Sequence, residues 1–187
     1  MSINANDYKD VLKAYFGIDV PKMGCVMLKV EKLKTDFIVP KEWEYYSENP
    51  DYRYIKGINA GDHVTLLYGL LRNANTIRAA VDKVLSGWEP EAPVLEKVGS
   101  FPSSYKDEPN YACIVGHIKL TDNIMEAHDR LSFLPHIDTH PGYKPHITLG
   151  YVKKENEKEA ISAFGRRFNG TKLKPVGLDY GRAPASN

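Results

Sequence analysis

Residues 62–70 read DHVTLLYGL and residues 145–152 read PHITLGYV, so two distant segments repeat the device His-x-Thr. Each segment is rich in β-branched and apolar residues, a composition that predicts a strand. Because side chains alternate between the two faces of a strand, a histidine shares a face with the threonine two residues later. The chain therefore predicts two strands that each present an imidazole beside a hydroxyl, from His63 with Thr65 and from His146 with Thr148.

Strict alternation also predicts how the neighbours of these residues divide between the two faces. In the first segment, Leu67 should share the face of the histidine. The residues expected on the opposite faces are Val64, Leu66 and Tyr68 in the first segment and Ile147, Leu149 and Tyr151 in the second.

Paired imidazoles are suited to acid–base chemistry at a phosphate. An imidazole titrates near neutral pH, so one ring can take a proton from a nucleophile while another gives one to a leaving oxygen. Hydroxyls on the same faces could donate hydrogen bonds to the non-bridging phosphate oxygens. We expect His63, Thr65, His146 and Thr148 to be catalytic, and the sequence leaves open which histidine is the base.

Composition limits the class of protein. The chain has 187 residues, of which 42% are hydrophobic, and a formal net charge of +1. That length predicts one domain over residues 1–187, with two lobes that share a groove. Near-neutral charge disfavours a long nucleic acid as partner but permits a small phosphorylated ligand. No obligate protein partner is evident, and no membrane span or signal peptide is predicted, so we expect a cytoplasmic protein.

The two cysteines, Cys25 and Cys113, lie in predicted strands. Two reduced structural thiols fit such a protein better than one buried disulfide.

Periodicity and breaker residues divide the chain into an alternating series of strands and helices. We expect a short helix first, and the proline-bounded, aromatic segment 39–51 should be a loop or lid. The order predicts a duplicated α+β unit whose halves face each other across a groove. Expected helices are 6–17, 73–88, 121–134 and 155–168; expected strands, besides the two histidine segments, are 23–32, 52–58, 93–101, 110–120 and 172–182.

The two His-x-Thr strands resemble the signature of the two-histidine (2H) phosphoesterase superfamily. The matching residues are His63-Val64-Thr65 and His146-Ile147-Thr148. The resemblance implies a bilobed α+β fold with pseudo-two-fold duplication and an active site in the central groove. It also implies cleavage of phosphodiesters without a metal or other cofactor, at cyclic phosphates or beside a ribose hydroxyl.

Within that superfamily, the extended stretch DHVTLLYGLL and the modest length resemble the phage anti-CBASS phosphodiesterases. This narrower resemblance implies that the substrate is a cyclic di- or trinucleotide messenger with 3′–5′ bonds. It further implies a role against bacterial anti-phage defence in the host cytoplasm. Two alternatives stay open: a 2′,3′-cyclic phosphodiesterase of RNA or tRNA processing, and a non-catalytic nucleotide-binding module.

Each residue singled out also has a purely structural interpretation. Either histidine alone could be an ordinary strand residue, and threonine is a good strand former. The segment with His128, His136 and His140 lacks a metal-ligand spacing and is better read as a solvated loop. His117, in the middle of a strand, is expected to be structural.

Aromatic residues gather before the first histidine segment. Nucleobases stack on such rings in proteins that bind single strands, although the same rings could instead cover a core. Candidate substrate-binding residues are Trp43, Tyr45, Tyr46 and Tyr54, together with Lys144, which could add positive charge beside the second histidine.

Overall fold

The computed structural model describes residues 23–103, 105, 107–138 and 142–182. Within this part of the chain, two three-stranded antiparallel sheets form, with strand orders β2-β1-β6 and β3-β4-β5. The strands are β1 (Gly24–Val30), β2 (His63–Leu70), β3 (Leu95–Pro102), β4 (Tyr111–Ile118), β5 (His146–Lys153) and β6 (Pro175–Arg182). Both histidine segments are thus strands, and the expected helix 6–17 lies outside the described residues.

Three α-helices and four short 3₁₀ turns complete the described structure. Thr121 caps the helix over Asp122–Leu131, since its hydroxyl accepts a hydrogen bond from the Ile124 N–H at 3.4 Å. The bounds are α2 (Arg78–Val84), α3 (Asp122–Leu131), α4 (Glu157–Phe168), η2 (Lys41–Trp43), η3 (Pro50–Tyr52), η4 (Ala74–Ile77) and η5 (Lys154–Asn156). None of the helices in the described ranges is long and apolar enough to cross a membrane.

Two local expectations were wrong. The helix expected over 73–88 is a 3₁₀ turn followed by the shorter α2, and Asn73 caps the turn. The Asn73 side chain accepts from the backbone N–H of Asn75 at 2.9 Å. The segment 52–58 is no strand; it carries only an isolated bridge between Lys56 and Tyr46.

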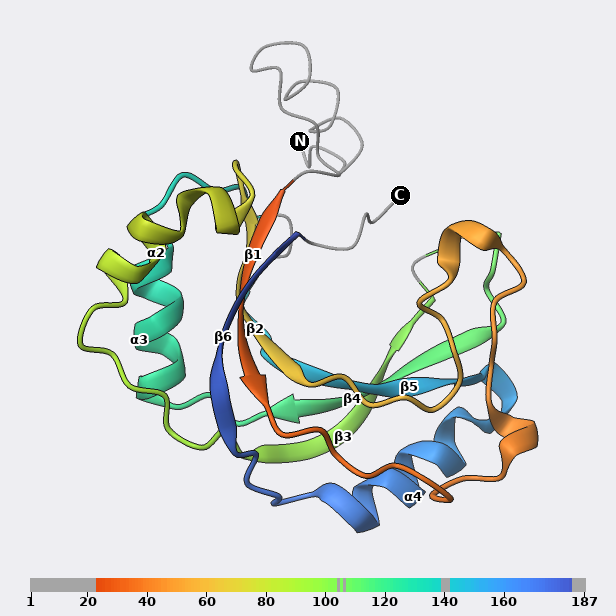
Figure 1. The fold of residues 1–187 in the computed structure, drawn as a ribbon. Coiled ribbons are helices and arrows are strands. Elements are labelled where there is room, and N and C mark those ends of the chain that lie inside the picture. The colour runs from red at the N-terminus through yellow and green to blue at the C-terminus, as the bar shows by residue number, and fades with distance from the viewer. Residues whose placement is uncertain (1–22, 104, 106, 139–141, 183–187) are drawn as a thin grey trace.

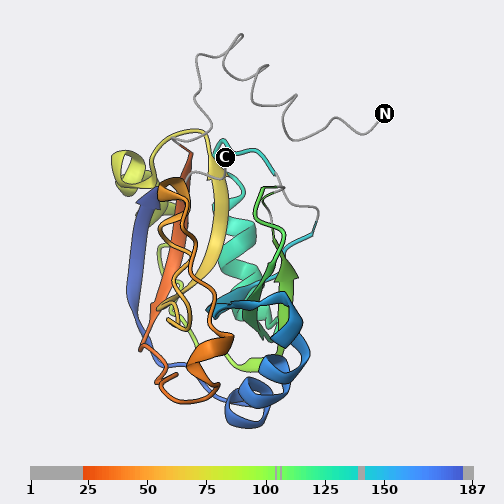
Figure 2. The same ribbon diagram turned by 90° about the vertical axis from the view of Figure 1, so that its right-hand side faces the viewer.

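The two sheets meet along β2 and β5, the inner edge strand of each (Figure 1). Helices α2 and α3 lie outside the first sheet, and α4 lies outside the second. The view turned by 90° shows the strands of the first sheet and those of the second as separate layers, with α4 at one end (Figure 2). We call the opposite side of both sheets, which carries none of these α-helices, the inner face.

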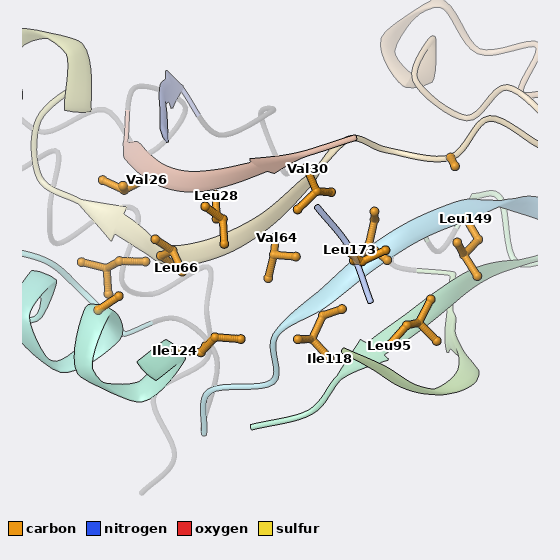
Figure 3. Close-up of a cluster of buried hydrophobic side chains, with 14 of the residues drawn as sticks. Val26, Leu28, Val30, Val64, Leu66, Leu95, Ile118, Ile124, Leu149 and Leu173 are labelled. Carbon is orange, nitrogen blue, oxygen red and sulfur yellow. The ribbon is translucent and has the colours of Figure 1, made fainter. Parts of the chain in front are cut away.

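Alternate positions of the strands form the hydrophobic core on the helix side. Val26 and Leu28 of β1 and Val64 and Leu66 of β2 are fully buried and point toward α3, where Ile124 meets them (Figure 3). Burial of such side chains stabilises the fold by roughly 1.5–3 kcal/mol each. The core thus takes alternate residues of β1 and β2 and leaves the others for the inner face.

Each histidine strand contains a β-bulge directly after its threonine. In β2, Thr65 pairs with Met27 and Leu67 pairs with Val26, so Leu66 is the extra residue. The expectation for Leu67 and Tyr68 was therefore wrong: an extra residue reverses the alternation beyond it. Leu67 is buried at 3% exposure, and Tyr68 turns to the face of the histidine.

The same bulge occurs in β5. Thr148 pairs with Val115 and Gly150 pairs with Ile114, so Leu149 has no partner on β4. Tyr151 is consequently brought to the face of His146, again contrary to strict alternation. The two strands share the same burial pattern over their first seven residues, which is consistent with the expected duplication.

Candidate active site

Residues 57–61, which lead into β2, run antiparallel to β5 along the edge of β5 that does not pair with β4. The N–H of Tyr151 donates to the carbonyl of Gly57 at 2.9 Å, and the N–H of Gly61 donates to the carbonyl of Thr148 at 2.7 Å. Gly61 is also close to the backbone of Thr148 as a whole, because a Cβ there would lie 3.5 Å from its carbonyl oxygen.

The segment that leads into β5 runs along β2 in the same manner. The N–H of Ile137 donates to the carbonyl of Gly69 at 2.9 Å. Further along, the hydroxyl of Tyr143 donates to the carbonyl of Thr65 at 2.8 Å. Together the two sets of contacts form one antiparallel seam between residues 57–71 on one side and residues 135–138 and 142–151 on the other.

The Gly61–Thr148 contact relates the positions of the two histidines. His63 follows Gly61 by two residues, and His146 precedes Thr148 by two, so antiparallel counting from the Gly61–Thr148 contact pairs the two histidines. The Thr65–Tyr143 contact lies immediately beyond them. Both imidazoles are partly exposed, and both belong to the inner face.

Behind the seam, β1 and β4 present equivalent residues to the two motifs. Cys25 pairs with Tyr68, and Cys113 pairs with Tyr151. Both cysteines are free, as expected, and they lie in different sheets. Burial raises the pKa of each thiol to about 11, so both remain protonated at neutral pH. Each tyrosine of the extended motif therefore lies beside an inert thiol.

His63 contacts a carboxylate. Its Nδ1 lies 3.4 Å from Oδ1 of Asp62, whose Oδ2 accepts a 2.6 Å hydrogen bond from Nζ of Lys29. Lys29 is also the cross-strand partner of His63 on β1. The hydrogen bond from Lys29, followed by that from His63, lowers the pKa of Asp62, so this carboxylate is ionised at neutral pH.

His146 has a neutral and more apolar setting. Its Nδ1 lies 3.0 Å from the carbonyl oxygen of Lys144, and its ring meets Phe101 edge to face with centroids 4.9 Å apart. His117 is its cross-strand partner on β4. Burial, together with the nearby His146, lowers the pKa of His117, which favours its neutral form.

Thr148 and Tyr151 share one partner. Both side chains form hydrogen bonds with the thiol of Cys113. These bonds lower the pKa of the thiol, but the larger effect of burial raises it. Because the bulge at Leu149 lies between them, both side chains meet on the inner face. The ring of Tyr151 also lies edge-on to Tyr111 and to Tyr54, with centroids 5.8 Å and 6.4 Å away.

The aromatic segment is not a free lid. It packs against the loop between β3 and β4 and forms a second hydrophobic cluster, which we call the tyrosine wall (Figure 1). The wall lies at the end of β5 that carries Tyr151. Its members are Tyr45, Tyr52, Tyr54, Ile55, Tyr105, Tyr111 and Tyr151.

The candidate substrate-binding residues have different surroundings. Trp43 packs against the main core, and Tyr45 lies against Tyr111 inside the wall, with ring centroids 5.3 Å apart. Tyr46 is 53% exposed, but its hydroxyl donates to Glu44 at 2.5 Å. Tyr54 is 41% exposed and lies beside the motif tyrosine. The side chain of Lys144 is exposed, two residues before His146.

The remaining described histidines have structural contacts. His128 stacks on Tyr143 with centroids 4.0 Å apart, and its Nδ1 lies 2.7 Å from the carbonyl of Leu66. His136 contacts the carbonyl of Leu134 through Nδ1 at 2.9 Å. His140 lies outside the described residues. Across the described ranges, no three histidine, cysteine or carboxylate side chains converge as metal ligands would.

A surface hollow of about 330 Å³ follows β1 and reaches the start of the seam at Ile58 and Asn59. It contains neither motif histidine nor motif threonine. Its lining residues are Lys32, Leu33, Lys34, Thr35, Asp36, Ile58 and Asn59.

Sequence reasoning did not single out Asp62, Lys29 or Phe101, although each contacts a motif histidine or its partner. It considered His117 only as structural. One available signal was the longer repeat His-x-Thr-Leu-x-Tyr, which is common to both strands and would have drawn attention to Tyr68 and Tyr151.

Comparisons with known proteins give the following result. No protein-family model and no curated protein sequence matches the chain. A solved structure of Usb1 from Kluyveromyces marxianus is similar, with 10% identity, a TM-score of 0.47, and coverage of 87% of this chain and 96% of that chain. The same protein with uridine monophosphate gives 9% identity, a TM-score of 0.48, and coverage of 88% and 96%.

Proposed function

We propose that this protein is a phosphodiesterase that cleaves a phosphodiester beside a ribose 2′-hydroxyl. The observation that carries this proposal is the antiparallel seam, whose Gly61–Thr148 register assigns His63 and His146 to opposed positions on the inner face. Each imidazole is followed by a threonine on the same face. Two titrating groups on opposite sides of one small space are what general acid–base catalysis at a phosphate requires.

The contacts of the two Nδ1 atoms support different roles for the two rings. A carbonyl oxygen can only accept, so the contact with Lys144 favours a proton on Nδ1 of His146 and a lone pair on Nε2. His146 is then the general base. The other ring, His63, lies beside the carboxylate of Asp62, with Nδ1 3.4 Å from Oδ1, and is left to supply the proton. His63 is then the general acid.

The reaction proceeds by in-line transfer at phosphorus. The ribose 2′-oxygen attacks and gives its proton to Nε2 of His146, while the bond from phosphorus to the 5′-oxygen breaks and that oxygen takes a proton from His63. The product pair is a 2′,3′-cyclic phosphate and a free 5′-hydroxyl. Thr65 and Thr148 donate hydrogen bonds to the non-bridging oxygens as their charge grows. Water can then open the ring with the histidine roles exchanged.

Two substrates contain the required linkage. One is a 3′–5′ linked cyclic di- or trinucleotide, which the resemblance to phage anti-CBASS enzymes favours. The other is the end of an RNA chain; an RNA that already ends in a 2′,3′-cyclic phosphate enters only the second step, in which water opens the ring. The tyrosine wall carries the carboxylates of Asp107 and Glu108 at one end of the inner face. Their charge disfavours the passage of a long polyanion and supports a compact substrate or a chain end.

The deciding experiment gives one enzyme three substrates in buffer with EDTA. The substrates are cyclic dinucleotides, cyclic trinucleotides and a short RNA with a 2′,3′-cyclic phosphate end. The variants His63→Ala and His146→Ala should each lose about 10²–10⁴-fold in rate. The matched control is His136→Gln, which removes an imidazole at the far end of the seam, where His136 bridges Leu70, and should keep full activity.

The pattern of turnover separates the candidate functions. Faster linearisation of the cyclic nucleotides supports a counter-defence enzyme, whereas opening of the RNA end alone supports RNA processing. Binding of nucleotides without any turnover would leave a non-catalytic binding module. Loss of activity in EDTA would contradict the metal-independent mechanism.

A further inference from the structure

The tyrosine wall is a fixed structure that joins two loops. The rings of Tyr52 and Tyr105 stack with centroids 3.9 Å apart and planes inclined by 23°. The Tyr52 hydroxyl donates to Asp107 at 3.2 Å, and the Ser47 hydroxyl donates to Glu108. These contacts connect residues that are more than 50 positions apart in sequence. The wall is therefore preorganised before any ligand binds.

Tyr54 is a residue of the wall that is both exposed and in contact with Tyr151 of the second histidine strand. Its ring is 41% exposed, and it lies edge-on to Tyr151, which shares the Cys113 thiol with Thr148. From Thr148 to Tyr151 the strand advances by roughly 7–10 Å, at about 3.3 Å per residue with one residue in the bulge. That span is comparable to the reach from a phosphate to the base of the same nucleotide.

The corresponding side of the first sheet is built from smaller residues. Where Phe101 pairs with Cys113 in the second sheet, Gly181 pairs with Cys25 in the first. A Cβ at Gly181 would lie only 2.6 Å from Cε of Met27, so this position accepts no side chain without movement. Among the described residues, the aromatic cluster thus belongs to the His146 side of the seam alone.

We propose that the nucleotide carrying the attacking 2′-hydroxyl binds with its base against Tyr54 on the tyrosine wall. This inference rests on the proposed function, in which His146 takes the proton from that hydroxyl. The ribose that His146 deprotonates must lie on the His146 side of the phosphate. Its base then extends along β5 toward Tyr151 and Tyr54. The leaving nucleotide lies on the other side, over β2 and β1.

This arrangement gives the substrate a direction. The base on the 5′ side of the scissile phosphate stacks on an aromatic ring, whereas the base on the 3′ side, which leaves with the 5′-oxygen, meets no part of the wall. Recognition of base type should therefore be concentrated on the nucleotide that becomes the 2′,3′-cyclic phosphate.

The test uses three dinucleoside monophosphates and the full-length protein. One has both bases, one has an abasic ribose on the 5′ side, and one has an abasic ribose on the 3′ side. Both riboses keep their 2′-hydroxyls. For the wild type, removal of the 5′-side base should raise KM by about tenfold, in the range of one lost base–aromatic stack. Removal of the 3′-side base should change KM by less than about threefold.

Substitution of Tyr54 should abolish this preference. Tyr54→Ala should raise KM by about tenfold for the two substrates that have a 5′-side base, with little effect on the substrate that lacks it. Tyr54→Phe should restore wild-type values because it keeps the ring. Phe133→Ala is the matched control, because it also removes an exposed ring, 86% exposed, at a position just after α3 that is not part of the tyrosine wall.

The outcomes are distinct. An equal loss on all three substrates would show that Tyr54 is only structural and would overturn the inference. Dependence on the 3′-side base would reverse the direction and would also overturn it. Absence of turnover of every substrate by the wild type would instead refute the proposed function itself.

Discussion

His117 is the cross-strand partner of His146, and the ring of Phe101 lies edge-on to both imidazoles. The charged groups that act on His117 are His146, Lys97, Lys144 and Glu96. Burial is the largest effect and lowers the pKa of His117 below its ordinary value of 6.5. A neutral His117 beside His146 adds no positive charge to the proposed base.

This lowered pKa predicts a pH dependence of stability. The unfolded chain binds a proton at His117 more readily than the folded chain does, so stability should fall as the pH drops below about 6.5. His117→Gln removes this titration and should flatten the slope between pH 7 and 5. Urea midpoints measured across that interval, for wild type and variant, test the expectation. Two parallel curves would contradict it.

The contact between Phe101 and His146 predicts a role in orienting the ring. An edge-to-face aromatic pair contributes about 0.5–1.5 kcal/mol beyond burial. Phe101→Leu should therefore lower kcat severalfold with little change in KM, and Phe101→Tyr should retain activity. Steady-state kinetics measure both constants. Phe133→Ala provides the control, because that ring is 86% exposed. A change in KM alone would argue against the orienting role.

Asp62 should position the ring of His63. Asp62→Asn replaces the carboxylate whose Oδ1 lies 3.4 Å from Nδ1 of His63, so kcat should fall severalfold with little change in KM. Lys29→Gln leaves that carboxylate in place and should have a smaller effect on kcat. Steady-state kinetics of both variants measure the two constants. A larger loss of kcat in Lys29→Gln than in Asp62→Asn would contradict the positioning role of Asp62.

Much of the fold was predictable from the chain. Apolar periodicity located α3, α4 and all of the strands except for their exact ends, and the repeated His-x-Thr identified the two strands that meet at the seam. Thr121 was recognisable as a cap because a hydroxyl directly before an amphipathic run has a clear local meaning. These features depend on near neighbours in sequence.

The features that sequence reasoning missed depend on distant neighbours. A bulge adds one residue to a strand, and a run such as Leu66-Leu67 is apolar whichever of the two is extra. The faces of Tyr68 and Tyr151 were therefore assigned wrongly. The contact of Asp62 with Lys29 depends on the β1–β2 register. The tyrosine wall depends on two loops that meet only in the folded chain.

Glu157 predicts a second, acidic limit to stability. Its carboxylate accepts from Lys154 at 2.5 Å and from the hydroxyl of Ser100 on β3, and these bonds lower its pKa. The stabilising effect is complete above pH 4.5, the ordinary pKa of a glutamate in the unfolded chain. It is lost as the pH falls through the lower pKa that Glu157 has in the folded protein. Glu157→Gln should therefore destabilise the protein at pH 7 and less so near pH 3. Thermal unfolding at both pH values tests this, and an equal loss at both would refute it.

Gly150 should tolerate no side chain. Its φ is +153°, and a Cβ there would lie 2.8 Å from Cα of Ile58 and 2.9 Å from the carbonyl oxygen of Gly57. Because those atoms belong to backbone, Gly150→Ala must displace the segment that leads into β2, at a cost of about 1–3 kcal/mol for overpacking. The seam should loosen, so kcat should fall along with the free energy of unfolding. Gly165→Ala in α4 is the control: its Cβ would come no closer than 3.4 Å to a side-chain atom, and helix propensity favours alanine. Denaturant unfolding and steady-state kinetics of both variants test this prediction. A fully active and fully stable Gly150→Ala protein would show that the close approach of this segment to β5 does not position the site.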